Sequence, residues 1–284
     1  MEDITLSQCL KGAWRDAASA VRHMPVLFLL VFVAVLATGV AGYEVQLSAP
    51  ASAASLSSSM TAGSATQAGA LGYSATSLGI SFVQCLVLAA LAVQVIRFAM
   101  TLGLEPGAGA RAPSTRALDA GFRRYFLLCI VLVAAYVAAT IAVVIAWIGL
   151  RLAGLSSGTS MAAAATLAVL AVCGVSYVSA RLSLLFPHTA AGGRLQWRAA
   201  WEATRGHFWV ITTTALVAIL PIVAIATVLS IIAEMLVAAS SIGSLTVGLL
   251  VVQSVATLLY TATAATCSVW LYKKFGADLK VQQG

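Results

Sequence analysis

Six long apolar stretches alternate with polar connections along the chain. Each stretch is long enough to cross the hydrocarbon core of a bilayer as a helix, which takes about 20 residues. The stretches are continuous and rich in Ala, Leu and Val, whereas a transmembrane β-strand would alternate in hydrophobicity over about 10 residues. The pattern therefore predicts an all-α membrane protein with six transmembrane helices, over residues 24–43, 78–103, 125–150, 161–186, 208–238 and 245–272.

A short segment with apolar and charged residues on opposite helical faces precedes the first, third and fifth predicted spans. In the first segment, Leu10 and Ala17 share one face, whereas Lys11 and Arg15 share the other. An amphipathic helix of this kind lies in the membrane interface. We therefore expect one membrane domain over residues 1–284, built as three hairpins with an interfacial helix before each: interfacial helix 1–23 and hairpin 24–104, interfacial helix and hairpin 114–186, interfacial helix and hairpin 195–273, and tail 274–284.

Two features interrupt this regular arrangement. The connection over residues 44–77 consists almost entirely of Ser, Ala, Gly and Thr after Ser48, and no charged residue follows Glu44 in it. Such a composition cannot build a core of its own, so we expect the segment to be mobile or to lie against the membrane surface. Pro221 falls within the fifth span, where we expect a tilt or a kink.

The composition agrees with a membrane protein and excludes a water-soluble one. Of the 284 residues, 61% are hydrophobic and 9% are charged, whereas soluble domains carry about 25% charged residues. Lys and Arg exceed Asp and Glu by 16 to 9, which gives a net charge of +7. Because no basic segment interleaved with aromatic residues is present, we assign this charge to orientation and to anionic lipids, and expect no nucleic-acid partner.

The basic residues are unevenly divided between the two sides of the predicted spans. None lies between Arg22 and Arg97, and Arg151 is the one basic residue in the connections of that side. Connections rich in Lys and Arg stay in the cytoplasm during membrane insertion. We therefore predict that both termini and the three interfacial helices are cytoplasmic, and that residues 44–77 are extracytoplasmic.

The chain lacks the motifs of enzymatic chemistry. Its five cysteines occur singly, without the paired spacing of a disulfide or a zinc site. His23, His188 and His207 come from separate segments and favour interfacial hydrogen bonds over metal binding. The sequence contains no Gly-rich phosphate loop, nucleophile elbow or paired acidic residues. We therefore expect no cofactor, no metal and no catalytic residue.

Three polar residues fall in the outer halves of predicted spans, where a polar side chain costs free energy unless it finds a partner. They are Gln84, Glu234 and Gln253. One interpretation is an intramembrane polar cluster with Glu234 as its acid. The other is that Glu234 lies near the end of a long span and extends to the lipid headgroups.

Small residues recur at four-residue spacing on the first and third spans. These ladders are Ala34, Thr38 and Gly42 on the first span, and Ala134, Ala138, Ala142 and Ala146 on the third. Small side chains let membrane helices approach closely. The ladders favour packing inside the bundle, with a dimer face as the alternative.

Arginine and tryptophan residues gather at the predicted cytoplasmic interface. Aromatic rings anchor at the headgroup level, and Arg binds lipid phosphate. We expect this group to contact anionic membrane lipids or a membrane-protein partner, and we call it the contact belt: Arg123, Arg124, Trp197, Arg198, Trp201 and Arg205.

Several segments resemble a signature of bacterial inner-membrane proteins. The segments are RLSLLFPH at 181–188, GGR at 192–194 and AAWEATRGHFW at 199–209, with AWR at 13–15 and RHMP at 22–25 near the start. They are similar to the membrane-domain family of glycerophosphoryl diester phosphodiesterases. That family's activity belongs to a separate soluble barrel, to which nothing in this chain is similar. The resemblance implies the membrane part alone, in a bacterial inner membrane.

Two functions agree with these observations. The first is a non-enzymatic polytopic inner-membrane protein that acts as a membrane scaffold, a partner subunit or a lipid-associated factor. The second is a transporter or permeation pathway for a small or amphipathic molecule, because similar hairpins recur in transporters. A cavity that extends to Glu234 would favour transport, whereas a helix bundle without such a cavity would favour a scaffold.

Overall fold

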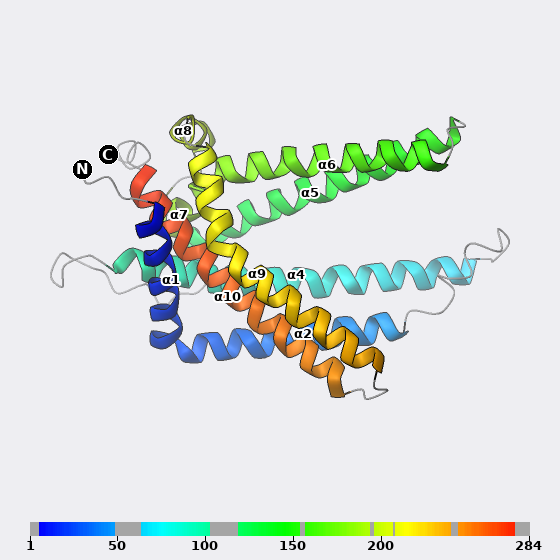
Figure 1. The fold of residues 1–284 in the computed structure, drawn as a ribbon, viewed down its shortest axis with the longest axis horizontal. Helices are drawn as coiled ribbons and strands as arrows, with labels where there is room; N and C mark the ends of the chain where they lie inside the picture. The colour runs from blue at the N-terminus through cyan, green and yellow to red at the C-terminus, as the bar shows by residue number, and fades with distance from the viewer. Residues whose placement is uncertain are drawn as a thin grey trace.

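A computed structural model of the chain describes residues 6–48, 64–102, 119–153, 157–193, 196–206, 208–239 and 244–275. These residues form helices joined by turns (Figure 1). In chain order the helices are α1 (Leu6–His23), α2 (Pro25–Ser48), α4 (Ser64–Thr101), α5 (Ala120–Leu152), α6 (Ser157–Leu182), α7 (Leu185–Ala190), α8 (Trp197–Ala203), α9 (Phe208–Ala239) and α10 (Ser244–Phe275).

Six of these helices are long and apolar enough to cross a membrane, which confirms the predicted number of spans. The candidate spans are Pro25–Val45, Thr76–Thr101, Ala120–Leu152, Gly158–Leu182, Phe208–Ile232 and Gly248–Phe275. A helix satisfies its backbone hydrogen bonds within its own segment, as the bilayer interior requires. The chain is therefore a multi-pass membrane protein.

The fourth span ends earlier than residue 186, where the apolar pattern placed its end. α6 stops at Leu182, a turn follows, and α7 begins at Leu185. Pro187 is the third residue of α7, a position whose N–H has no intrahelical acceptor in any case. Most of α7 is buried. The apolar run therefore contains a span and a second, short helix that the sequence pattern did not separate.

The connection expected over residues 44–77 is shorter in the structure. α2 continues to Ser48, and α4 begins at Ser64. Residues 64–77 are rich in Ala and contain no proline, so they support a helix. Residues 49–63 lie outside the described part of the chain. The helices therefore extend into both ends of this range, and the expectation of a mobile or surface-lying segment stays a prediction.

The three segments expected as interfacial helices differ in the structure. α1 is a separate helix that runs across the direction of α2 and α4 (Figure 1), with Cys9 and Ala17 buried and Lys11 exposed. Residues 120–124 are instead the first turns of α5, capped by Asp119, whose carboxylate accepts a hydrogen bond from the Ala120 N–H at 2.7 Å. α8 is a short helix that follows α7.

The buried core lies at the end of the bundle that carries α1, which we call the α1 end. α10 is central to it and contacts α1, α2, α4, α7 and α9. Leu91 and Ile96 of α4, Leu128 of α5 and Val269 of α10 are no more than 1% exposed. Tight packing is therefore concentrated at one end of the molecule.

α5 and α6 pack against each other and leave the rest of the bundle away from the α1 end (Figure 1). The buried residues of α5 all lie in its first turns, between Gly121 and Leu128. Farther along, Ile145 of α5 is 64% exposed and Val169 of α6 is 62% exposed. The helices α5 and α6 therefore contact the rest of the bundle mainly at the α1 end.

α9 contains the proline predicted to distort the fifth span. Pro221 lies inside this helix. Proline has no backbone N–H, and its ring clashes with the preceding turn, so it interrupts helical bonding. Figure 1 shows α9 changing direction along its length, as expected for a helix with an internal proline.

Candidate functional site

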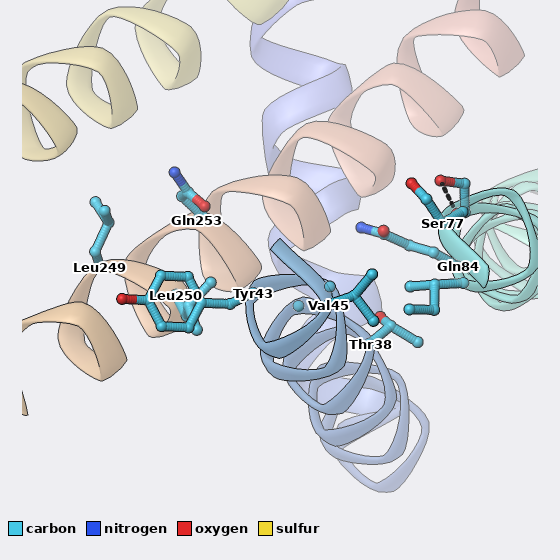
Figure 2. Close-up of a pocket in the computed structure, with 12 residues that line it drawn as sticks. Thr38, Tyr43, Val45, Ser77, Gln84, Leu249, Leu250 and Gln253 are labelled. Carbon is cyan, nitrogen blue, oxygen red and sulfur yellow. Dashed lines mark hydrogen bonds between the residues drawn. The ribbon is translucent and has the colours of Figure 1, made fainter. Parts of the chain in front are cut away.

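A pocket of about 450 Å³ lies between α2, α4 and α10 (Figure 2). Gln84 from α4 and Gln253 from α10 both line it, so the structure brings together two members of the predicted polar cluster. The third member, Glu234, belongs to α9, and its side chain lies outside the described residues. The pocket is lined by Thr38, Gly39, Gly42, Tyr43, Val45, Ser77, Ile80, Ser81, Gln84, Leu249, Leu250 and Gln253.

The α2 wall of this pocket is formed by the end of its small-residue ladder. A Cβ atom added at Gly39 would lie 3.6 Å from the Leu250 side chain, in ordinary van der Waals contact. A Cβ atom added at Gly42 would meet no described atom within 4 Å. Nearer the α1 end, Val35 is buried in the core. Two members of the ladder, Thr38 and Gly42, therefore line the pocket, whereas its first member, Ala34, is half-buried outside it.

A second, apolar pocket of about 360 Å³ lies between α4, α5 and α10. Ser81 and Gln84 line both this pocket and the first one, so the two pockets are neighbours on α4. Its remaining lining residues are Cys85, Leu88, Ala89, Ala92, Tyr125, Cys129 and Thr261. No charged residue lines either pocket in the described part of the chain. We call these two neighbouring pockets, one with neutral polar side chains and one apolar, the crevice.

At the α1 end, polar side chains from three helices hold α7 and the turn after it. Arg97 of α4 donates from Nε to the Ala190 carbonyl at 3.1 Å. His188 Nδ1 is hydrogen-bonded to the Tyr272 hydroxyl of α10 at 3.0 Å. Arg124 of α5 donates to carbonyls of the turn, at 3.1 Å to Gly192 and 3.0 Å to Gly193. These contacts give α7 a structural role that the sequence pattern did not indicate.

The residues of the contact belt are not equivalent in the structure. Arg124 uses its guanidinium to bind the backbone after α7, whereas Arg123 on the same helix is exposed. The members on and after α8 are also exposed: Trp197, Arg198, Trp201 and Arg205. Five members of the belt are therefore accessible at the surface, although the Trp201 ring also contacts the Tyr177 ring of α6.

Arg181 is a residue of this region that sequence analysis did not single out. Its guanidinium lies 5.2 Å from the Tyr177 ring, 5.3 Å from the Trp201 ring and 5.9 Å from the Phe208 ring. It also donates to the Tyr177 hydroxyl at 2.8 Å and to the Thr204 hydroxyl at 3.3 Å. Each cation–π contact contributes about 0.5–1 kcal/mol at an exposed site. Arg181 thus joins α6 to α8 and to the start of α9.

The described residues contain no group of three His, Cys, Asp or Glu side chains placed to hold a metal ion. His23 donates from Nδ1 to the Ser19 carbonyl of its own helix at 2.8 Å, and His188 is hydrogen-bonded to Tyr272. His207 lies outside the described residues. The two described histidines therefore have local hydrogen-bonding roles.

The chain was compared with family models, curated proteins and solved structures. No family model, curated protein or solved structure matches it. The similarity of its residues 181–209 to the phosphodiesterase membrane-domain family therefore stays a prediction.

Proposed function

We propose that this chain is a non-enzymatic membrane protein that associates with lipid through the crevice. The observation that carries the proposal is that a polar pocket and an apolar pocket lie next to each other and share the lining residues Ser81 and Gln84. Amide and hydroxyl groups line one part, and Leu88, Ala89 and Ala92 line the other. Ligand sites combine apolar walls with a few polar groups that fix orientation. The combination suits an amphipathic molecule with an uncharged polar head and an acyl chain.

The position of α5 and α6 supports entry of such a molecule from the bilayer. Tyr125 and Cys129 of α5 form one wall of the apolar pocket, just where α5 begins to leave the bundle. Beyond them, most exposed residues of α5 are apolar, as at Ile130 and Val133, and the exposed Arg151 lies at the far end of the helix. Between Cys129 and Leu150, α5 carries no charged residue, so a lipid chain that lies along this part of the helix meets no charge of α5 before the crevice.

The test uses a substitution that adds a side chain to the wall of the polar pocket. Gly42→Leu adds an isobutyl group at a position where the new Cβ atom meets no described atom within 4 Å. Gly149→Leu on α5 is the matched control, since it is equally open and lines neither pocket. With purified protein and dioleoylglycerol as probe, native mass spectrometry should show lost binding in Gly42→Leu and retained binding in Gly149→Leu. Equal binding in both variants would contradict the proposal.

A transport function is the second candidate, and Gln84 and Gln253 in one pocket favour it. Polar side chains in the membrane interior often mark a substrate path. Reconstituted in proteoliposomes, a transporter should increase the rate at which a fluorescent diacylglycerol analogue crosses the bilayer, and Gly42→Leu should abolish the increase. Binding of dioleoylglycerol without any increase in transfer would assign the protein to lipid association alone.

We also propose a bacterial inner-membrane location with both termini and the α1 end in the cytoplasm. Arg15, Arg97, Arg124 and Lys273 lie at the α1 end, whereas Arg151 ends α5 at the opposite end. The exposed charged face of α1 supports an interfacial position. In a chain without native cysteines, an impermeant thiol reagent added outside cells should label a cysteine at Ser58 and not one at Ser114. The reverse labelling would overturn the orientation.

A further inference from the structure

We infer that a third pocket, at the α1 end, binds a phosphate group. The pocket has a volume of about 490 Å³ and is lined by Arg15, Asp16, Ser19, Leu102, Trp270 and Lys273. Two of these residues are cationic and one is anionic. The site lies apart from the crevice, shares no lining residue with it and differs from it in charge. The inference is therefore independent of the proposed function.

The back wall of the pocket is fixed by contacts between α1 and α10. The Trp270 indole lies against the backbone of α1 at Gly12, where an added Cβ atom would be 2.6 Å from Trp270 Cε2. The indole Nε1 donates to the Asp16 carboxylate at 2.9 Å. Asp16 is only 7% exposed. The glycine and the carboxylate together hold the indole in one position.

Lys273 supplies a cation at a fixed place beside this wall. Its ammonium donates to the carbonyls of Ala99 at 3.0 Å and Leu102 at 3.1 Å, at the end of α4. These carbonyls belong to the C-terminal end of a helix, which favours a nearby positive charge. These two hydrogen bonds therefore hold the ammonium group at the edge of the pocket.

Arg15 supplies the second cation and is the residue best suited to bind phosphate. Its Nε lies 3.7 Å from the Asp16 carboxylate, and its side chain is 79% exposed. No described contact of Arg15 involves its two terminal nitrogens. A guanidinium bonds phosphate oxygens in a bidentate manner, with charge-assisted hydrogen bonds. The exposed Arg15 side chain can therefore move toward a phosphate group, whereas Trp270 and Lys273 are held in place by their hydrogen bonds.

Two sources of phosphate share this chemistry: the headgroup of a phospholipid and free inorganic phosphate. Tryptophan at the headgroup level is typical of membrane interfaces, and Trp270 forms a wall here. Detergent-purified full chain is titrated with dioleoyl phosphatidylglycerol, with and without excess inorganic phosphate, and bound lipid is measured by native mass spectrometry. If inorganic phosphate displaces the bound lipid, the free ion is a ligand of the pocket. If it does not displace the lipid, the ligand is the phospholipid headgroup.

The decisive variant is Arg15→Gln, with Lys11→Gln as its matched control. Both residues are exposed on α1 and both changes remove one charge, but Lys11 does not line the pocket. We expect the dissociation constant for phosphatidylglycerol to rise about tenfold in Arg15→Gln, which corresponds to the loss of one charge-assisted contact. In Lys11→Gln it should change less than about twofold, since a charge outside the pocket acts only through screened attraction.

Two results would overturn the inference. One is unchanged phosphatidylglycerol binding in Arg15→Gln, and the other is equal weakening in both variants, which would reflect surface charge alone. Binding of dioleoylglycerol, measured in the same samples, separates this inference from the crevice. Arg15→Gln should leave it unchanged, and Gly42→Leu should leave phosphatidylglycerol binding unchanged.

Discussion

The α1 end and the far half of the pair α5–α6 are built from similar apolar helices, yet they pack very differently. At the α1 end, Leu91 and Leu185 are fully buried, and polar side chains bind carbonyls of neighbouring helices. Along α5 and α6, residues of the same kind stay exposed, as Ile145 and Val169 do. A membrane helix can leave apolar side chains in lipid at no cost, because lipid tails are as apolar as they are.

The difference shows what holds helices together in this protein. Apolar surface alone does not join them, since α5 carries it over its whole length and leaves the bundle. At the α1 end the helices approach where small residues allow it, as at Gly12 beneath Trp270. Interhelical hydrogen bonds then join them, such as the bond from the Thr266 hydroxyl to the Ala13 carbonyl at 3.0 Å. Close packing and polar contacts, rather than hydrophobicity, separate the two regions.

The largest effect should come from opening a cavity in the packed region. Leu91→Ala removes a side chain that is 0% exposed, so we expect a loss of about 2–4 kcal/mol in unfolding free energy. Ile145 of α5 is 64% exposed, so Ile145→Ala should lower the unfolding free energy by about 0.5 kcal/mol or less. Reversible unfolding in mixed micelles measures both. Similar losses at the two sites would show that α5 packs as tightly as the α1 end.

The spans were predictable from the sequence because a run of about 20 apolar residues is sufficient to define one. α7 was not, because Pro187 and His188 follow an apolar run without a break that marks a new helix. The helix is too short to form alone and depends on contacts from α4, α5 and α10. Its existence is therefore a property of tertiary packing.

The candidate sites were predictable only in part, for a related reason. The cost of burying an amide indicated that Gln84 and Gln253 need polar surroundings, and the structure places them in one pocket. The apolar part of the crevice had no sequence signal, because its lining residues, such as Leu88 and Ala89, do not differ from the other apolar residues of the spans. The ladder on the third span was misleading, since Ala134, Ala138 and Ala142 are exposed and not packed inside the bundle.

A smaller effect should separate two neighbouring arginines of the contact belt. Arg124→Gln removes the donor to the Gly192 and Gly193 carbonyls, so we expect a loss of about 1.5 kcal/mol in unfolding free energy. Arg123→Gln removes the same charge from an exposed position and should stay within about 0.5 kcal/mol of the parent. The same mixed-micelle unfolding measures both. Equal stability of the two variants would show that the contacts of Arg124 with the turn after α7 do not stabilise the fold, and Arg124 would then be a lipid-contact residue like Arg123.

The smallest effect concerns the reactivity of the Cys9 thiol. This reactivity measures how tightly α1 packs against α10, and measuring it requires no change at Cys9 itself. Burial of the thiol beside α10 raises the pKa of Cys9 above its ordinary value of 9.0, and Lys274 opposes this rise. The thiolate is the reactive form, so a chain with Cys9 as its single cysteine should react slowly with N-ethylmaleimide at pH 7. A chain whose single cysteine replaces the exposed Ala18 should react several times faster.

The pH dependence of Cys9 has a definite sign. Because the folded chain holds the thiol proton more tightly than the unfolded chain, this contribution to stability is complete below about pH 9 and decreases as the pH rises. The labelling rate of Cys9 should therefore rise at a higher pH than that of the Ala18 position. Detergent-induced unfolding should abolish the difference, since both thiols are then in water. Matching rates and matching pH profiles in the folded chains would show that α1 separates readily from α10, and the α1 end would then be no more closed than α5 and α6.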